Sequence, residues 1–141
     1  MSNNAPTDIS LTKFEWSRLL ESSGGDYGHA LTTGADGSIY IAGQTWGDLD
    51  GQIYSDWGDA FLSKFNPDGT QDWTRLFGSS NYDDEAYALT TGADGSIYIV
   101  GETGGNLVGQ RNSGYDDAFI SKFNPDGTKV WTKILGTSDT D

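Results

Sequence analysis

The sequence predicts an all-β protein built from two copies of one four-stranded antiparallel unit, and two observations support this fold class. Residues 30–45 and 88–103 read ALTTGADGSIYIAGQT and ALTTGADGSIYIVGET, and residues 59–74 return at 117–132 with three differences. Glycine accounts for 20 of the 141 residues and aromatic residues for 13%, which is typical of turn-dense β folds. A repeat of this length is one supersecondary unit that must stack on its own kind to bury its apolar faces.

Each copy divides into four short strands, which are clearest in the second copy. Residues 86–91 form the first strand, and an Asp-Gly turn closes a hairpin onto the second strand at 96–100, which is rich in β-branched and aromatic residues. A long, polar, glycine-rich connection leads to the third strand at 117–123. The turn Asn-Pro-Asp-Gly and a fourth strand at 130–135 complete the unit. No segment has a helical period.

The second strand decides how the units pack. Side chains alternate along a strand, so Ile97 and Ile99 point to one face while Tyr98 and Val100 point to the other. Both faces are apolar, as they are for the equivalent residues 39–42 of the first copy. Four-stranded sheets that are covered on both faces and repeated in tandem form the blades of β-propellers.

The same blocks resemble the bacterial β-propeller repeat family, sometimes called the seven-bladed β-propeller repeat. The motifs A-L-T-T-G-x-D-G-S-I-Y-I-x-G-x-T, D-A-F-x-S-K-F-N-P-D-G-T and W-T-x-x-(L/F)-G occur in this order twice between about residues 14 and 136. The resemblance implies a propeller fold, common in secreted or cell-surface bacterial proteins, and it implies no single activity. Residues 4–11 are similar to linkers that precede cadherin-like repeats in large bacterial surface proteins.

The strands add up to an incomplete propeller. We expect full blades at about 28–79 and 86–136, an extra outer strand at 14–20, a linker with a partial strand at 1–13 and a tail at 137–141. Propellers need roughly four to eight blades to close. Two blades therefore leave an apolar sheet face at each end. We expect two, three or four chains to complete a ring head to tail, or the chain to be part of a longer propeller.

The composition of the chain limits the classes of partner that it can bind and the places where we expect it. The net charge of −13 repels phosphate backbones and anionic lipid, so no nucleic acid and no membrane insertion are expected. The chain has no cysteine, which excludes disulfides and thiol chemistry. No apolar run approaches the roughly 18 residues that span a bilayer, and the first ten residues lack the features of a signal peptide. We expect an extracellular or cell-surface location, with the cytoplasm as the alternative.

The loops that differ between the copies are the expected binding surface. In a propeller blade, the loops joining the second and third strands lie on the same side as the blade-to-blade connections. These loops differ between the copies, whereas the turns on the opposite side are identical, and variable loops on a rigid scaffold commonly carry binding. Plain drift of solvated loops is the alternative explanation. The expected binding residues are Trp46, Asp48, Asp50, Tyr54, Asp56, Trp57, Tyr82, Asp83, Asp84, Arg111 and Tyr115.

One of these loops also has the spacing of a cation site. Asp48, Asp50, Asp56 and Asp59 fall at relative positions 1, 3, 9 and 12, which loosely matches the ligand spacing of a calcium loop. The glycine is misplaced, and the second copy has Val108 and Gly114 at two of these positions. We therefore expect no cofactor, with calcium as the alternative.

No catalytic pattern is visible. His29 is the single histidine, and the chain contains neither a G-x-S-x-G elbow nor the several His or Cys ligands that zinc requires. We expect a non-catalytic module that assembles into a ring and acts as a scaffold through its variable loops. The alternatives are a calcium-assisted glycan-binding propeller that uses Trp46, Tyr54 and Trp57, an engineered or recently duplicated repeat protein whose role is assembly, and an enzyme whose site spans a completed ring.

Overall fold

The computed structural model describes residues 15–107 and 109–138, and its strands form two four-stranded antiparallel sheets that follow chain order. We call the sheets blade 1 and blade 2. Blade 1 consists of β1 (Asp26–Thr33), β2 (Ile39–Thr45), β3 (Asp59–Phe65) and β4 (Gln71–Phe77). Blade 2 consists of β5 (Asp84–Thr91), β6 (Ile97–Thr103), β7 (Asp117–Phe123) and β8 (Lys129–Leu135). The predicted all-β fold with two full blades is confirmed.

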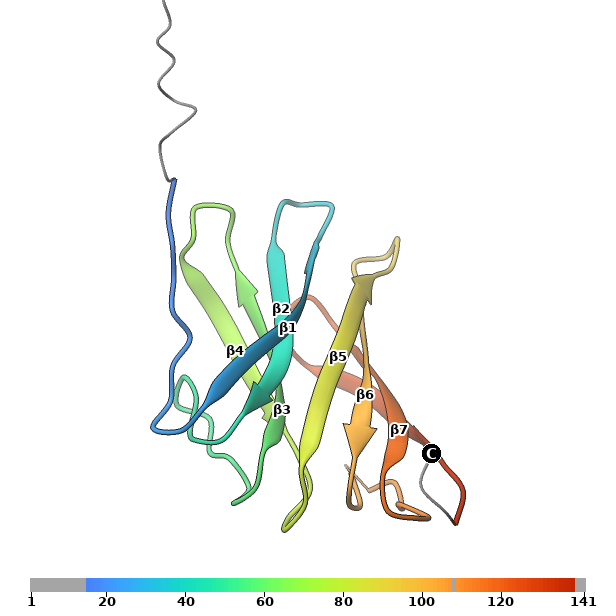
Figure 1. Ribbon diagram of the computed structural model, residues 1–141. Coiled ribbons are helices and arrows are strands. Elements are labelled where there is room, and N and C mark those ends of the chain that lie inside the picture. Colours follow the sequence, from blue (N-terminus) through green and yellow to red (C-terminus); the bar gives the residue numbers. More distant parts are fainter. Residues whose placement is uncertain (1–14, 108, 139–141) are drawn as a thin grey trace, which may run out of the picture.

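Figure 1 shows the two sheets side by side, with the broad face of one turned toward the other. The tight turns that join β1 to β2, β3 to β4 and β5 to β6 lie at the upper end, and the β2–β3 loop and the β4–β5 connection lie at the lower end. We call these the turn end and the loop end. Among the described residues there is no helix of the length and apolarity that a membrane crossing requires.

The tight turns of both blades use the same chemistry. In the β1–β2 turn, the backbone N–H of Gly34 donates to the carbonyl of Ser38 at 2.8 Å, and the N–H of Ser38 donates to Asp36 Oδ1 at 2.9 Å. This backbone hydrogen bond lowers the pKa of the Asp36 carboxyl. Gly37 has a φ of +87°, where a side chain would be strained, and Gly127 repeats this in the β7–β8 turn with +89°. The aspartates before these glycines are therefore turn-forming residues.

Strands β1 and β5 are bulged where they pair with the second strand of their blade. The register shifts between Gly28 and Ala30 in blade 1 and between the equivalent residues in blade 2. Beside the second bulge, a Cβ built on Gly101 would lie 1.9 Å from the carbonyl oxygen of Glu85. Only a residue without a side chain allows the two backbones to approach this closely.

The segment before β1 differs from the expected outer strand. Residues 15–20 run along blade 1 without forming a strand. A strand needs a neighbour to receive its backbone hydrogen bonds, and no preceding third strand is present among the described residues to provide them. The expected linker at 1–13, residue 14, Val108 and positions 139–141 of the tail lie outside the described residues.

Candidate functional site

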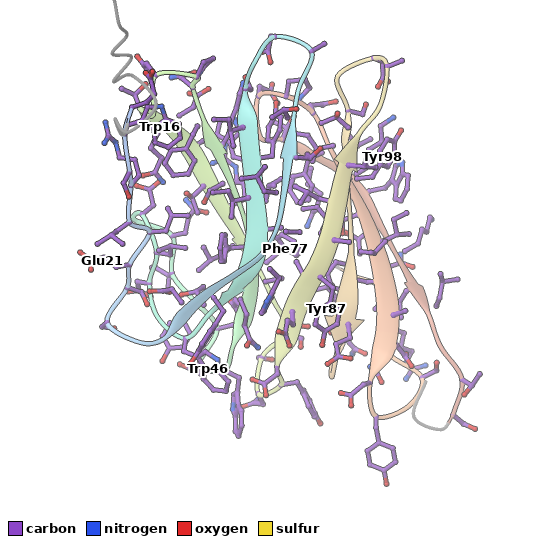
Figure 2. The ribbon with its side chains drawn as sticks, turned by 45° about the horizontal axis from the view of Figure 1, so that its top comes forward. Trp16, Glu21, Trp46, Phe77, Tyr87 and Tyr98 are labelled. Atoms are coloured by element: carbon purple, nitrogen blue, oxygen red, sulfur yellow. The ribbon has the colours of Figure 1, made fainter. Side chains whose placement is uncertain are left out.

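The two blades pack through one apolar face of each sheet. Phe77 of β4 lies between them, with its ring centroid 5.8 Å from that of Phe119 and 5.4 Å from that of Phe123 (Figure 2). Tyr40 and Trp73 of blade 1 belong to the same buried cluster, and their rings are tilted by 49° to each other with centroids 6.2 Å apart. The remaining buried side chains at this contact include Ala42, Ala60 and Leu62 from blade 1 and Ala86, Ile97 and Ile99 from blade 2.

Three side chains of blade 1 donate hydrogen bonds to the β7–β8 turn of blade 2. Trp73 Nε1 donates to the carbonyl of Pro125 at 3.1 Å, and Lys64 Nζ donates to the same oxygen at 3.3 Å. Arg75 Nε donates to the carbonyl of Gly127 at 3.0 Å. We call the side of a blade that carries these donors its donor face, and the opposite side, which carries the turn carbonyls, its acceptor face.

An unpaired donor face lies at the blade 2 end of the molecule. Leu135 is 64% exposed, whereas Phe77 at the same position of blade 1 is 7% exposed. Val100 is 43% exposed, whereas its counterpart Ala42 is fully buried. Trp131, the counterpart of Trp73, is half-buried. The positions that are buried between the blades on blade 1 thus have apolar counterparts on blade 2 that no described blade covers.

An acceptor face lies at the opposite end, on blade 1. Ile39 and Ile41 are half-buried there, although their counterparts Ile97 and Ile99 in blade 2 are fully buried. A groove of about 420 Å³ runs over this face, and Leu31 forms part of its wall. Its lining also includes Phe61, Phe65, Trp16, Leu19 and Leu20.

Residues 15–20 cover part of this acceptor face. Trp16 Nε1 donates to the carbonyl of Pro67 at 3.1 Å, which reproduces the bond from Trp73 to Pro125 (Figure 2 shows Trp16 at the turn end). Its ring lies so close to Gly69 that a Cβ there would be 2.6 Å from Trp16 Cδ2. Residues 15–23 read EWSRLLESS, and residues 72–80 read DWTRLFGSS. The segment therefore occupies the place that the outer strand of a preceding blade would have.

Most of the predicted binding residues lie at the loop end. Trp46, Trp57, Tyr82 and Tyr115 are exposed there, and Figure 2 shows Trp46 pointing away from the sheets. Tyr82 and Tyr115 line one shallow cleft of about 490 Å³ together with Asn106, Asn112 and Asp116. Recognition of a glycan or a protein by these residues stays a prediction. Asp48, Asp50, Asp56, Asp83 and Arg111 are also exposed, and Tyr54 is half-buried.

Three of the four aspartates proposed for calcium have hydrogen-bond partners within the chain. Asp48 Oδ1 accepts the backbone N–H of Tyr54 at 3.1 Å, and Asp50 Oδ2 accepts a hydrogen bond from Gln71 Nε2 at 2.9 Å. Asp59 is buried and bonds Ser55, whereas Asp56 is exposed. Within the described ranges, no three His, Asp or Glu side chains are grouped so that they could hold a metal ion. Calcium binding to this loop stays a prediction.

A recurrent contact between serine and aspartate fixes the loop end. The carboxylate of Asp84, at the start of β5, accepts hydrogen bonds from both the backbone N–H and the hydroxyl of Ser79. Asp84 was expected at the binding surface, but its side chain is fully buried. The sequence signal is a serine four or five residues before the aspartate that begins a strand. The same contact joins Ser22 to Asp26, Ser55 to Asp59 and Ser113 to Asp117.

Burial raises the pKa of the Asp84 carboxyl to about 6, from a usual value of 3.8, and the nearby charge of Asp59 adds to the rise. The folded chain then binds the proton more tightly than the unfolded chain does. Asp84 therefore contributes stability that is fully present below about pH 4, and this contribution is lost as the pH rises through about 6.

Asp84→Asn is expected to remove this pH dependence. The amide keeps an acceptor for the Ser79 hydrogen bonds and carries no charge. Between pH 4 and pH 7, the free energy of unfolding of the variant should therefore rise by about 2 kcal/mol relative to that of the wild type. Urea unfolding followed by tryptophan fluorescence at a series of pH values measures the difference. Asp56→Asn, which removes an exposed carboxylate of a loop, is the control. Parallel stability curves for wild type and Asp84→Asn would contradict the prediction.

A polar cluster links the inner strands of the two blades. His29 Nε2 on β1 lies 2.6 Å from Glu85 Oε1 on β5, and the hydroxyl of Tyr87 donates to the other oxygen of Glu85 at 3.1 Å. Burial, followed by the neighbouring Glu102 and Glu85 carboxylates, raises the pKa of Tyr87, so the phenol stays a donor. The sequence shows His29 as the single histidine but does not reveal its partner, because Glu85 comes from the other copy. The cluster ties the blades together.

The fold and its paired faces define a β-propeller module. The family model described as beta-propeller repeat matches residues 15–50 and 72–107, which is more than half of the 141 residues. The chain therefore belongs to the beta-propeller repeat family. The first match begins at residue 15, so the repeat of the family includes the Trp16 segment.

The chain is also similar to part of a curated protein. Regulatory protein FlaEY from Caulobacter vibrioides is 30% identical to this chain over 156 aligned residues. The alignment covers 96% of this chain and 16% of the relative, so this chain spans only a small part of that protein's length.

Proposed function

We propose that the chain is a non-catalytic propeller module whose copies assemble head to tail into a ring. The donor face of blade 2 in one copy packs on the acceptor face of blade 1 in the next. Two, three or four copies give four, six or eight blades, within the range in which propellers close. The ring then serves as a structural and binding scaffold, with the exposed aromatic residues of the loop end repeated around one side.

The complementarity of the two open ends carries this proposal. Trp131 and Lys122 repeat Trp73 and Lys64, the donors of the contact inside the chain. On blade 1, the residues Asn66-Pro67-Asp68-Gly69 repeat the β7–β8 turn that receives those donors. The rotation that relates blade 1 to blade 2, applied twice, would place the next copy beside the first. Such a heterologous contact closes into a ring when the rotation allows it.

The name of the relative is in keeping with this role. FlaEY is a regulatory protein by name, and a scaffold that presents loops to a partner suits regulation without catalysis.

Assembly is tested by the mass of the purified chain in solution. Light scattering over a range of concentrations should give a multiple of 15.2 kDa. Val100→Asp places a charge on the open donor face and should yield the monomer with an unchanged β-sheet circular dichroism spectrum. Ile53→Asp, at an exposed position of the loop end, should assemble like the wild type. A well-folded wild-type monomer at every soluble concentration would overturn the proposal.

A further inference from the structure

The acceptor face that a second copy would use already has an occupant from its own chain. The indole of Trp16 fills the place beside Pro67 and Gly69 that the indole of Trp73 fills beside Pro125 and Gly127. Both contacts leave no space between the ring and the turn glycine. An incoming Trp131 from another copy needs the same place, and two indoles cannot share it.

The rest of the segment also reproduces the contact of an outer strand. Hydrogen bonds from Thr70 lower the pKa of Asp68, and the charge of Arg18 adds to this effect. Arg75 acts in the same way on Asp126 across the contact between the blades, after the hydrogen bonds from Thr128. Leu20 lines the groove at the position that corresponds to Phe77. The mimicry thus extends over three alternate positions of the outer strand, Trp16, Arg18 and Leu20, which correspond to Trp73, Arg75 and Phe77.

The two occupants differ in what they contribute. Residues 15–20 are tethered to blade 1, so their local concentration at the acceptor face is high. They form no strand, however, and Ile39 and Ile41 stay half-buried beneath them. A donor face from a second copy brings Tyr98, Val100 and the other residues of a whole sheet, and it would bury more apolar surface.

We propose that residues 15–20 are a displaceable plug on the acceptor face of blade 1, and that a second copy docks by exchanging its Trp131 for Trp16. This rests on the head-to-tail assembly proposed above. The plug shields the apolar face of the free chain and sets a threshold concentration for assembly. The occupant that replaces it is the β8 side of another copy of this chain.

Sedimentation velocity on the 141-residue chain and four variants tests the exchange. Trp16→Ala removes the competing indole and should tighten self-association by about tenfold. Trp131→Ala keeps the plug and should abolish association, and the double variant should be monomeric. Arg18→Glu is a second way to weaken the plug, because it places a negative charge beside Asp68 at an exposed position, and it should shift association in the same direction as Trp16→Ala.

The indole N–H signals in a nitrogen–proton correlation spectrum supply an independent readout. In the free chain, the signals of Trp16 and Trp73 should exchange slowly with solvent, because both donate to proline carbonyls. On assembly, Trp131 should gain protection while Trp16 loses it. The two tryptophan variants assign the signals.

Each outcome bears on a different claim. A wild type that associates, together with plug variants that associate no more tightly, overturns the plug and leaves the proposed ring standing. Failure of the well-folded wild type to associate at any soluble concentration overturns the ring itself. Tighter association of either plug variant, lost again when Trp131 is removed, supports the exchange.

Discussion

Trp73→Ala is expected to lower the free energy of unfolding by about 3–5 kcal/mol, the range for truncating a large aromatic side chain in a core. The indole packs at an angle against the Tyr40 ring and donates to the Pro125 carbonyl. Its ring centroid lies 5.3 Å from Cζ of the Arg75 guanidinium. Its removal leaves a cavity between the blades, and the Pro125 carbonyl keeps only the hydrogen bond from Lys64. The loss should appear as a lower urea midpoint.

Trp131→Ala provides a control that differs only in its surroundings. Trp131 occupies the same position in the second copy and is only half-buried, because no blade covers it within the chain. Measured at low concentration, where copies do not associate, this variant should lose about 1 kcal/mol or less. Equal losses for the two variants would show that the contact between the blades does not stabilise the chain.

Gly101→Ala should destabilise the chain by about 3 kcal/mol, through overpacking rather than through a cavity. The added methyl group would overlap the carbonyl oxygen of Glu85, and it would also press on Phe119 at 2.8 Å. Since the first of these is a backbone atom, β5 and β6 must separate to relieve the overlap. That separation disturbs the bulge beside Ala86 and the sheet that faces blade 1.

Gly28→Ala is the matched control for this substitution. Gly28 pairs with Gly43 in the equivalent hairpin of blade 1, but a methyl group there would meet only Ile41 Cγ2 at 3.6 Å, an ordinary contact. We expect a change of about 0.5 kcal/mol in either direction. Thermal unfolding of both variants at one pH measures the difference. A Gly101→Ala variant as stable as Gly28→Ala would contradict the close approach of the strands.

The strands could be predicted from the sequence because their pattern is local. The third strand at 117–123 agrees with β7 at both ends, and the turn aspartates at 36 and 126 form the hydrogen bonds that such turns require. The segment at 14–20 could not be predicted correctly from the same kind of pattern. It has the residues of an outer strand, but a strand also needs a partner, which belongs to no local pattern.

The site was less predictable, because it depends on which residues of the two copies meet. The exposure of aromatic residues such as Trp46 and Tyr115 could be predicted, because they lie in loops that differ between the two copies. The burial of Asp84 does not follow from the run of acidic residues to which it belongs, and its sequence signal is Ser79, five residues earlier, which the sequence analysis did not use. The partner of His29 also remained hidden, because Glu85 reaches it only once the second copy has packed on the first.

The match between the two ends of the molecule has a consequence for how such proteins grow over evolution. A blade added by further duplication would have a complementary face to pack against at either end, without new compensating substitutions. Adding units therefore requires few other changes. The number of units would be limited by the number of blades at which a propeller closes, and not by the need to evolve a new contact surface.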